Sequence, residues 1–520
     1  MSIRTSYVEL IAPTDEIGDN KAIRLTHRGF LNVEYEASKL FFDNYEIEQP
    51  AIPLLHPEFS NPLFLKMFCE GLKKADLKRI PEGYDGITNI MNFYLSGANK
   101  QLARPNRMNY SPALNLVHIS IKAIIENKTD NNLKYIPYAD AYQLIEKEIQ
   151  KFNIKGGFLD ELISEGILSK NIFWKNGKEA EEGIYLVYER FEDHLVTSYL
   201  IDKHLNRDAP HESFKEGGVL FSLIKDESAC YINKGVIEAL CIQLPEQVGK
   251  EIYELAPHCK DFFPVIKCFI ESLIWRRTDT ITDKLKDYIN EYVNKYNDTF
   301  NQFLDTMITV TSNNNHYFNA DFLHEHLMKY SMAGRDAWWS IYISSQFDEP
   351  TAVKRLIDWA WSTLDRNFSS DEAIRLTSKT LSWFLVTSNR FLRDAATKAL
   401  ITLLKNKISI LLSLLEDFKE VDDPYIYERL YCVAYGCALK TSDENSLKNL
   451  SVYVYQTIFD KEEVYPHILL RDYGRGVIEY TISRNIELDI DIQKVRPPYK
   501  SKWTYDIPSS EEIEQYLKNF

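Results

Sequence analysis

The sequence predicts a mainly α-helical protein with a short β edge, lid helices, a winged helix and a long α-solenoid. Three observations favour this fold class. Apolar residues recur at helical spacing through most of the chain, and strand-like runs gather around residues 169–188. Strand signals nearly vanish beyond about residue 210, where helices follow one another with short polar breaks. These patterns divide the chain into five parts.

The composition is typical of a globular, multi-domain protein. The chain has 520 residues, 45% hydrophobic and 26% charged, without an apolar run long enough to span a membrane. The first residues, MSIRTSYVEL, lack the features of a signal peptide, and the seven cysteines form no Cys-x-x-Cys pair. We therefore expect a soluble cytoplasmic protein with reduced cysteines. A net charge of −15 favours protein partners over nucleic acid.

The first two parts are residues 1–60 and residues 61–155. The first carries short extended runs that suggest a sheet edge, followed by a helix from about residue 33; the runs are residues 4–10 and 22–25. The second part begins at Asn61-Pro62, where Asn can cap a helix and Pro suits its first position. Further helices are expected there, at residues 86–101, 112–125 and 139–152.

The third part, residues 156–208, changes pattern. A helix closed by glycine is followed by two strand-like runs, SKNIFW and GIYLVY, which the polar turn KNGKEAEE joins. The segment ERFEDHLVTSYLI then returns to helical spacing. A helix, a β-hairpin and another helix predict a winged helix.

The fourth part, residues 209–485, predicts stacked helical hairpins similar to HEAT or TPR repeats. Arg393, Arg429 and Arg471 each stand near the start of an apolar helix, 36 and 42 residues apart, which suits a two-helix repeat. One hairpin cannot bury its own apolar face, whereas stacked hairpins bury a continuous core. The arginines are expected to lie between repeats and to pair with acidic residues. The last part, residues 486–520, should form an extended strap and one final helix.

Motifs for chemistry are missing from the sequence. A phosphate-binding loop needs a glycine-rich turn and a Lys followed by Ser or Thr, and neither Gly177-Lys178 nor Gly249-Lys250 fits. His324 and His326 diverge by about 200° on a helix, so they do not share a metal easily. We expect no catalytic residues, no metal site and no ATP hydrolysis by this chain alone.

Five tryptophans cluster in the repeat region, and two of them are adjacent. Packing between helices explains such a cluster, but Trp338 and Trp339 cannot both point the same way on a helix. One of the two is therefore expected nearer the surface, where tryptophan often anchors interfaces. Trp338 and Trp339 are the candidate partner-binding residues.

Several segments together resemble the STAND class of signalling ATPases, and most closely the bacterial antiviral STAND proteins called Avs. Together these segments span almost the whole chain. The segments are RTSY (4–7), EFSNPLFLKMFCEGL (58–72), YERFEDHLVTSYLI (188–201), NRFLRDAATKAL (389–400), DPYIYERLYCVAYG (423–436), RDYGRGVIEY (471–480) and RPPYKS (496–501).

The resemblance implies three nucleotide-binding residues. Arg4 stands where the family places an arginine that senses the terminal phosphate, for which a guanidinium is suited. Pro62 resembles the lid proline that packs against adenine, although helix initiation alone also explains it. Where related switches have a histidine that reaches the diphosphate, this chain has Tyr188, so Arg190 is the substitute candidate. Ordinary exposed arginines are the alternative at both Arg4 and Arg190.

The resemblance also implies a function. Residues 1–60 would be the remnant of an ATPase core, and the repeats would sense a large phage packaging or structural protein. The missing ATPase core, with its ATP and Mg²⁺, and an effector would lie upstream of Met1, and the intact parent could form a homo-oligomer. The alternative is an independent helical-repeat scaffold that binds proteins and has no nucleotide role.

Overall fold

The computed structural model describes most of the chain. It covers residues 7–11, 25, 27–31, 33–80, 86–154, 156–175, 179–362, 369–502 and 508–518. Helices make up 66% of the residues and strands 4%, which confirms a mainly α protein and is consistent with an α-solenoid. Nowhere in these ranges is there a helix with both the length and the hydropathy that crossing a bilayer requires.

The chain forms two compact units, residues 1–317 and residues 318–520. The helices of the first unit are α1 (Val8–Ile11), α3 (Glu34–Tyr45), α4 (Pro62–Lys74), α5 (Gly86–Leu102), α6 (Leu116–Asp130), α7 (Tyr138–Gln150), α8 (Phe158–Ser164), α9 (Glu189–His204), α10 (Val219–Ile224), α11 (Glu227–Ile232), α12 (Lys234–Val248), α13 (Ile252–Leu255), α14 (Phe263–Trp275), α15 (Leu285–Tyr288) and α16 (Asn297–Thr309). Each unit is described by itself below.

The first half of unit 1 is built around one buried core. Helices α4 to α9 contribute most of its apolar side chains, and Ile242 of α12 and Trp275 of α14 belong to the same core. The start of α4 follows from its sequence, because the Asn61 side chain accepts hydrogen bonds from the amides of Leu63 and Phe64. The predicted boundaries at residues 60, 155 and 208 all fall inside this unit.

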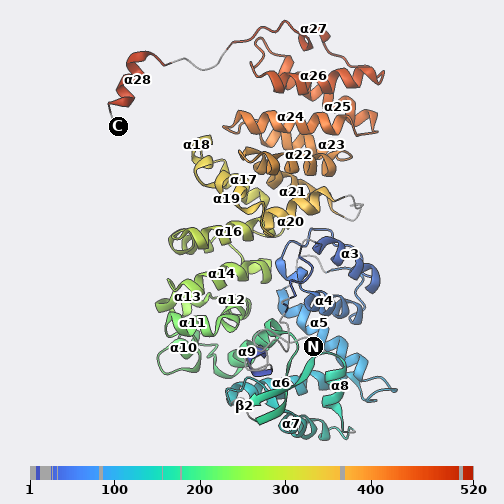
Figure 1. Ribbon diagram of the computed structural model, residues 1–520, viewed down its shortest axis with the longest axis vertical. Helices are drawn as coiled ribbons and strands as arrows, with labels where there is room; N and C mark the ends of the chain where they lie inside the picture. The colour runs from blue at the N-terminus through green and yellow to red at the C-terminus, as the bar shows by residue number, and fades with distance from the viewer. Residues whose placement is uncertain are drawn as a thin grey trace. The chain divides into compact units, whose positions relative to one another are not determined.

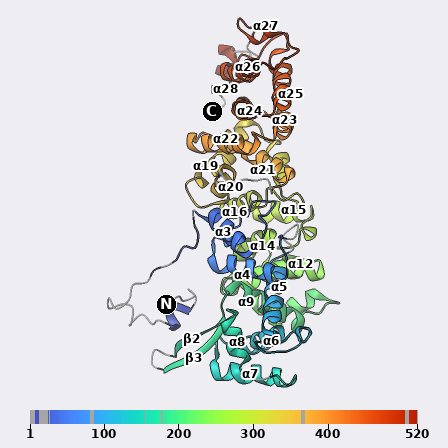
Figure 2. The same ribbon diagram turned by 90° about the vertical axis from the view of Figure 1, so that its right-hand side faces the viewer.

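The strands described in the structure form one antiparallel sheet in the order β1-β3-β2. Strands β2 (Leu168–Lys175) and β3 (Glu179–Leu186) make a long hairpin, and β1 (Ile136–Pro137) pairs with the end of β3. Figure 2 shows the hairpin beside α8. A helix, a hairpin and a helix therefore occur in the predicted order across residues 158–204.

The sheet edge predicted at residues 4–10 was wrong where the structure describes it. Val8–Ile11 is a turn of α-helix, α1. Tyr7 and Ile11 are four residues apart, so a helix places both on one face, and both pack on Phe173 and Tyr185 of the hairpin. Burial on the hairpin thus outweighs the local strand pattern. The run at residues 22–25 lies almost wholly outside the described residues.

The second half of unit 1 is a stack of helices. Helix α9 packs on α12, α12 on α14, and α14 on α16 (Figure 1). Each helix in this series contacts a helix two or three places later in the chain, as expected for stacked hairpins.

Unit 2 contains two parallel series of helices. Its helices are α17 (Ala320–Leu327), α18 (Met332–Arg335), α19 (Ile341–Gln346), α20 (Ala352–Trp361), α21 (Asp371–Trp383), α22 (Arg390–Leu404), α23 (Ile408–Asp417), α24 (Pro424–Ala438), α25 (Glu444–Val454), α26 (Ile468–Ser483), α27 (Ile492–Val495) and α28 (Ser510–Leu517). One series is α20, α22, α24 and α26, and the other is α17, α21, α23 and α25 (Figure 1). Two one-turn elements matter for the site below: the π-helix η8 (Asp336–Ser340) and the 3-10 helix η9 (Phe384–Val386).

Side-chain caps fix where the helices of the first series begin. Asn389, Asp423 and His467 accept hydrogen bonds from backbone amides at the starts of α22, α24 and α26. The three repeat arginines follow within two turns of these caps. Arg429 lies 3.9 Å from Asp394 of the preceding repeat, while Arg393 and Arg471 face the rings of Tyr425 and Tyr499. The predicted pairing with acidic residues thus holds for Arg429, and aromatic rings take that place for the others.

Close packing between the last repeats yields a first prediction. A Cβ added at Gly474 would lie 2.7 Å from Ile458 Cδ1 and 3.3 Å from both Phe459 and Val454, so no side chain fits without displacement. We expect Gly474→Val to destabilise unit 2 by about 1–3 kcal/mol through overpacking. Thermal unfolding followed by circular dichroism measures this loss.

Gly334 provides the matched control for that variant. It is also helical, but an added Cβ would meet nothing closer than 3.4 Å. Gly334→Ala should leave the melting temperature unchanged or raise it slightly, because Ala has the higher helix propensity. Equal losses in the two variants would contradict tight packing at Gly474.

Candidate functional site

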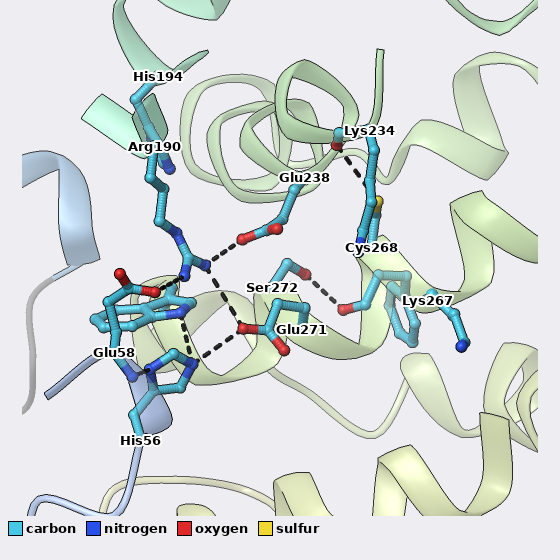
Figure 3. A network of polar contacts seen from close by, with 12 residues as sticks. His56, Glu58, Arg190, His194, Lys234, Glu238, Lys267, Cys268, Glu271 and Ser272 are labelled. Atoms are coloured by element: carbon cyan, nitrogen blue, oxygen red, sulfur yellow. Dashed lines mark hydrogen bonds and ion pairs between the residues drawn. The ribbon is translucent and has the colours of Figure 1, made fainter. Parts of the chain in front are cut away.

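A largely buried cluster of charges in unit 1 is the candidate site. Arg190, in the first turn of α9, lies among three carboxylates: Glu58 from the short helix before α4, Glu238 of α12 and Glu271 of α14 (Figure 3). These four side chains are between 15% and 29% exposed. One guanidinium therefore joins four separate segments of the chain.

The geometry uses several nitrogen atoms of the guanidinium. Arg190 Nη2 donates to Glu238 and lies 3.7 Å from Glu271 Oε1, while Nη1 lies 3.5 Å from Glu58 Oε2. The flat face of the group lies over the ring of Trp275, with 4.7 Å between Cζ and the ring centroid. A planar fork with an apolar face suits arginine and not lysine. Arg190 Nε is buried and donates no hydrogen bond in the described structure.

His56 connects the cluster to the segment before α4. Its Nδ1 accepts a hydrogen bond from the backbone amide of Glu58, and its Nε2 lies within hydrogen-bond distance of Glu271 Oε1, at 3.0 Å. The indole nitrogen of Trp275 lies 3.1 Å from the same Nε2. Burial lowers the pKa of His56, which keeps the ring uncharged at neutral pH.

Glu58 connects the cluster to the start of α4. Its Oε1 accepts from the hydroxyl of Tyr188 and from Asn61 Nδ2, the latter over 3.1 Å, while Oε2 faces Arg190. Asn61 is the cap of α4 and Pro62 is its first residue. Pro62 and Arg190 are thus linked through Asn61 and Glu58.

The charges in the cluster do not balance. One arginine faces three carboxylates, so full ionisation would leave an excess of negative charge away from water. Burial, together with the neighbouring Glu271, raises the pKa of Glu238 to about 7 despite the opposing charge of Arg190. Burial also acts on Glu271, but the hydrogen bond from His56 and the charge of Arg190 outweigh it and hold its pKa below the usual range. The cluster therefore binds a proton close to neutral pH.

The residues predicted from the sequence fall in three places. Arg4 lies outside the described residues. Pro62 is half-buried at the start of α4, and Arg190 is in the cluster rather than on the surface. As arranged, the three carboxylates would repel a phosphate, so the cluster does not fit a nucleotide diphosphate. Contact between Arg190 and a phosphate would require these ion pairs to open, and it stays a prediction.

The two candidate tryptophans belong to unit 2. Trp339 is fully buried, and its indole N–H donates to the carbonyl of Trp383 over 2.9 Å. Trp338 is half-buried and contacts the rings of His326 and Tyr330 edge-on. Of the pair, Trp338 is therefore the residue nearer the surface.

The sequence interpretation missed His56 and all three carboxylates. A signal for two of them exists, because Glu238 and Glu271 are single carboxylates inside otherwise apolar helical runs, VIEALCI and CFIESLIW. Such a residue needs a partner when its helix face is buried. Nothing in the sequence pairs either of them with Arg190.

Comparison with known proteins adds no family to these observations. No protein-family model matches the chain, and no curated protein matches it either.

The raised pKa of Glu238 predicts that unit 1 is less stable at alkaline pH. A carboxyl whose pKa rises from 4.5 to about 7 on folding contributes stability that is complete below pH 4.5 and is lost as the pH rises through 7. We expect a loss on the order of 2 kcal/mol between pH 5 and pH 8.5. Glu238→Gln, which keeps an acceptor for Arg190 without titrating, should flatten this dependence.

Thermal unfolding at a series of pH values measures the effect. Glu216→Gln is the control, since Glu216 is an exposed glutamate of the same unit. It should follow the wild-type profile. Parallel profiles for wild type and Glu238→Gln would show that the proton is held elsewhere.

Removal of the central charge should be the most damaging change in the cluster. Arg190→Gln leaves three buried carboxylates without their cation, and we expect a loss of about 3–5 kcal/mol at pH 7.5. The loss should shrink at pH 5, where the carboxyl of Glu238 is protonated and needs its cation less. Arg207→Gln, at an arginine that is 54% exposed, should cost less than about 1 kcal/mol. Denaturant unfolding at the two pH values distinguishes these outcomes.

Proposed function

We propose that this chain is the regulatory and sensor portion of a bacterial antiviral STAND ATPase. The helical repeats would bind a phage protein, a large packaging or structural protein, and the helices before them would pass this event to an ATPase core and effector. In this proposal α4 to α7 are the lid, and α8, the β2-β3 hairpin and α9 are a winged helix.

The Arg190 cluster is the observation that supports a switch. It joins the segment before α4 and the first turn of α9 to the first stacked helices, α12 and α14. Displacement of α12 or α14 by a bound protein would remove a carboxylate from Arg190. Because the cluster is largely buried and its charges do not balance, loss of one contact changes its electrostatic free energy. A bound protein could therefore shift the chain between two arrangements of these helices.

The stacked helices support the binding half of the proposal. Two series of helices in unit 2 present a long surface that no single globular core would provide. Trp338 of η8 is half-buried, with its ring against His326 and Tyr330, and is the proposed anchor for the phage protein.

The second candidate is an independent helical-repeat scaffold. The stacked helices favour it as much as the sensor, since a scaffold needs the same surface. The two differ at the Arg190 cluster: a sensor passes a change through it, whereas in a scaffold the cluster only holds α4, α9, α12 and α14 together.

Amide hydrogen exchange on the complex separates these functions. The purified chain is first tested by biolayer interferometry against the purified packaging and structural proteins of a phage. A sensor predicts binding, about tenfold weaker in Trp338→Ala, and altered exchange at residues 56–64 and 188–194. A scaffold predicts protection in the repeats alone. If none of the phage proteins binds, the sensor assignment is wrong.

A further inference from the structure

Unit 2 contains an open pocket of about 860 Å³, a volume within the range of small-ligand and peptide sites. Its walls come from the one-turn helix η8, from α19, from the loop after η9 and from the starts of α22 and α24. The pocket is thus built from the N-terminal ends of two successive repeats and the segment that precedes them.

Two carboxylates line this pocket, and neither forms an ion pair with a described residue. Asp336 is exposed and forms no ion pair or hydrogen bond with the described residues. Asp423 is 3% exposed and caps α24 with one oxygen, Oδ1, which accepts from the amides of Tyr425 and Ile426. Its other oxygen, Oδ2, accepts no hydrogen bond in the described structure. A carboxylate oxygen left open in a pocket can accept a hydrogen bond from a ligand in place of water.

Two arginines lie near these carboxylates, and Arg393 itself lines the pocket. Each has a buried Nε without a hydrogen-bond partner, while each also donates to a backbone carbonyl. Arg335 is buried behind Asp423 and donates to the backbone carbonyls of Leu327, Tyr330 and Asp422. Arg393 donates to the carbonyl of Thr387 over 2.9 Å and lies against the ring of Tyr425. Burial and the neighbouring Asp336 raise the pKa of Asp423, although Arg335 opposes them. Neither arginine donates to the open oxygen of Asp423 in the described structure.

The rim of the pocket is apolar. Ile341 is 63% exposed, Met332 42% and Tyr425 36%, and all three line the pocket. Ser344, Ser388 and other serines also line the pocket. A pocket lined by carboxylates and by exposed apolar side chains suits a long side chain with an aliphatic stem and a cationic end.

We propose that this pocket binds an arginine or lysine side chain of a partner polypeptide, flanked by apolar residues that lie on Met332, Ile341 and Tyr425. The cationic end reaches Asp336 and Asp423, and the flanking residues cover the rim. The inference rests on the proposed function, for which it names the chemistry of the partner segment. Charge complementarity selects this occupant, because an acidic or neutral segment would leave both carboxylates unpaired.

Selection from a random nine-residue peptide library on the immobilised full chain tests the site. Enriched peptides are then synthesised, and their binding is measured by fluorescence anisotropy at low and physiological salt. We expect enriched peptides to carry Arg or Lys next to apolar residues and to bind about tenfold more weakly when that residue becomes Gln. An absence of enriched peptides, or enrichment of acidic ones, overturns the proposal.

Asp423→Asn and Asp336→Asn are the decisive variants. Asn caps a helix about as well as Asp, so Asp423→Asn removes the charge while α24 keeps its start, which circular dichroism verifies. Each variant should weaken the peptide about tenfold, and Asp489→Asn, an exposed Asp of the same unit, should not. Unchanged affinity in both pocket variants overturns the site. So does calcium binding by the free chain, measured by calorimetry, that both variants abolish and that displaces the peptide.

The outcome for the pocket is separable from the outcome for the sensor. A phage protein that binds wild type, Asp336→Asn and Asp423→Asn equally would leave the sensor function intact and refute the pocket as its contact. Basic peptides that bind the pocket when no phage protein binds would support the site and refute the sensor.

Discussion

A single guanidinium lies among three carboxylates in unit 1. Arg190 lies over the ring of Trp275 and beside Glu58, Glu238 and Glu271, and these contacts come from the segment before α4, from α12 and from α14. Apolar packing would hold these segments together as firmly, and a buried ion pair adds little net stability over such packing. The cluster makes the arrangement of these segments depend on the positions of the charged side chains and on the protonation of the carboxylates. If α4 and α9 moved independently of α12 and α14, at least one charged side chain would be exposed to water or left without its ion-pair partner.

Stacking imposes the other constraint on the molecule. A helical hairpin leaves one apolar face uncovered, and each pair in both units covers the pair before it. The caps at Asn389, Asp423 and His467 set the start of each helix, and hence the height at which the following arginine lies. The pocket in unit 2 arises at these same helix starts, where backbone ends and caps replace apolar side chains.

Local patterns predicted the helices well because they depend on near neighbours in sequence. The cap at Asn61, the hairpin of residues 168–186 and the spacing of Arg393, Arg429 and Arg471 are all visible in short windows. The burial of Arg190 was not, since its partners lie 48 to 132 residues away and no local rule joins them. The turn of helix at Val8–Ile11 was missed for the same reason, because its partner surface is the distant hairpin. The nucleotide roles predicted for Arg4 and Pro62 depended on a resemblance and not on any contact within this chain.

Asp423 belongs to two structures at once, as the cap of α24 and as a wall of the pocket. Most substitutions there would unwind a helix start as well as alter the pocket. Few amino acids are therefore compatible with the fold at this position. Asn is the main exception, because it retains the cap and discards the charge. A lineage could therefore exchange a preference for cations for a preference for neutral groups in one mutational step, without first losing the fold. In a protein whose partner evolves to escape it, such a position would let recognition change faster than architecture.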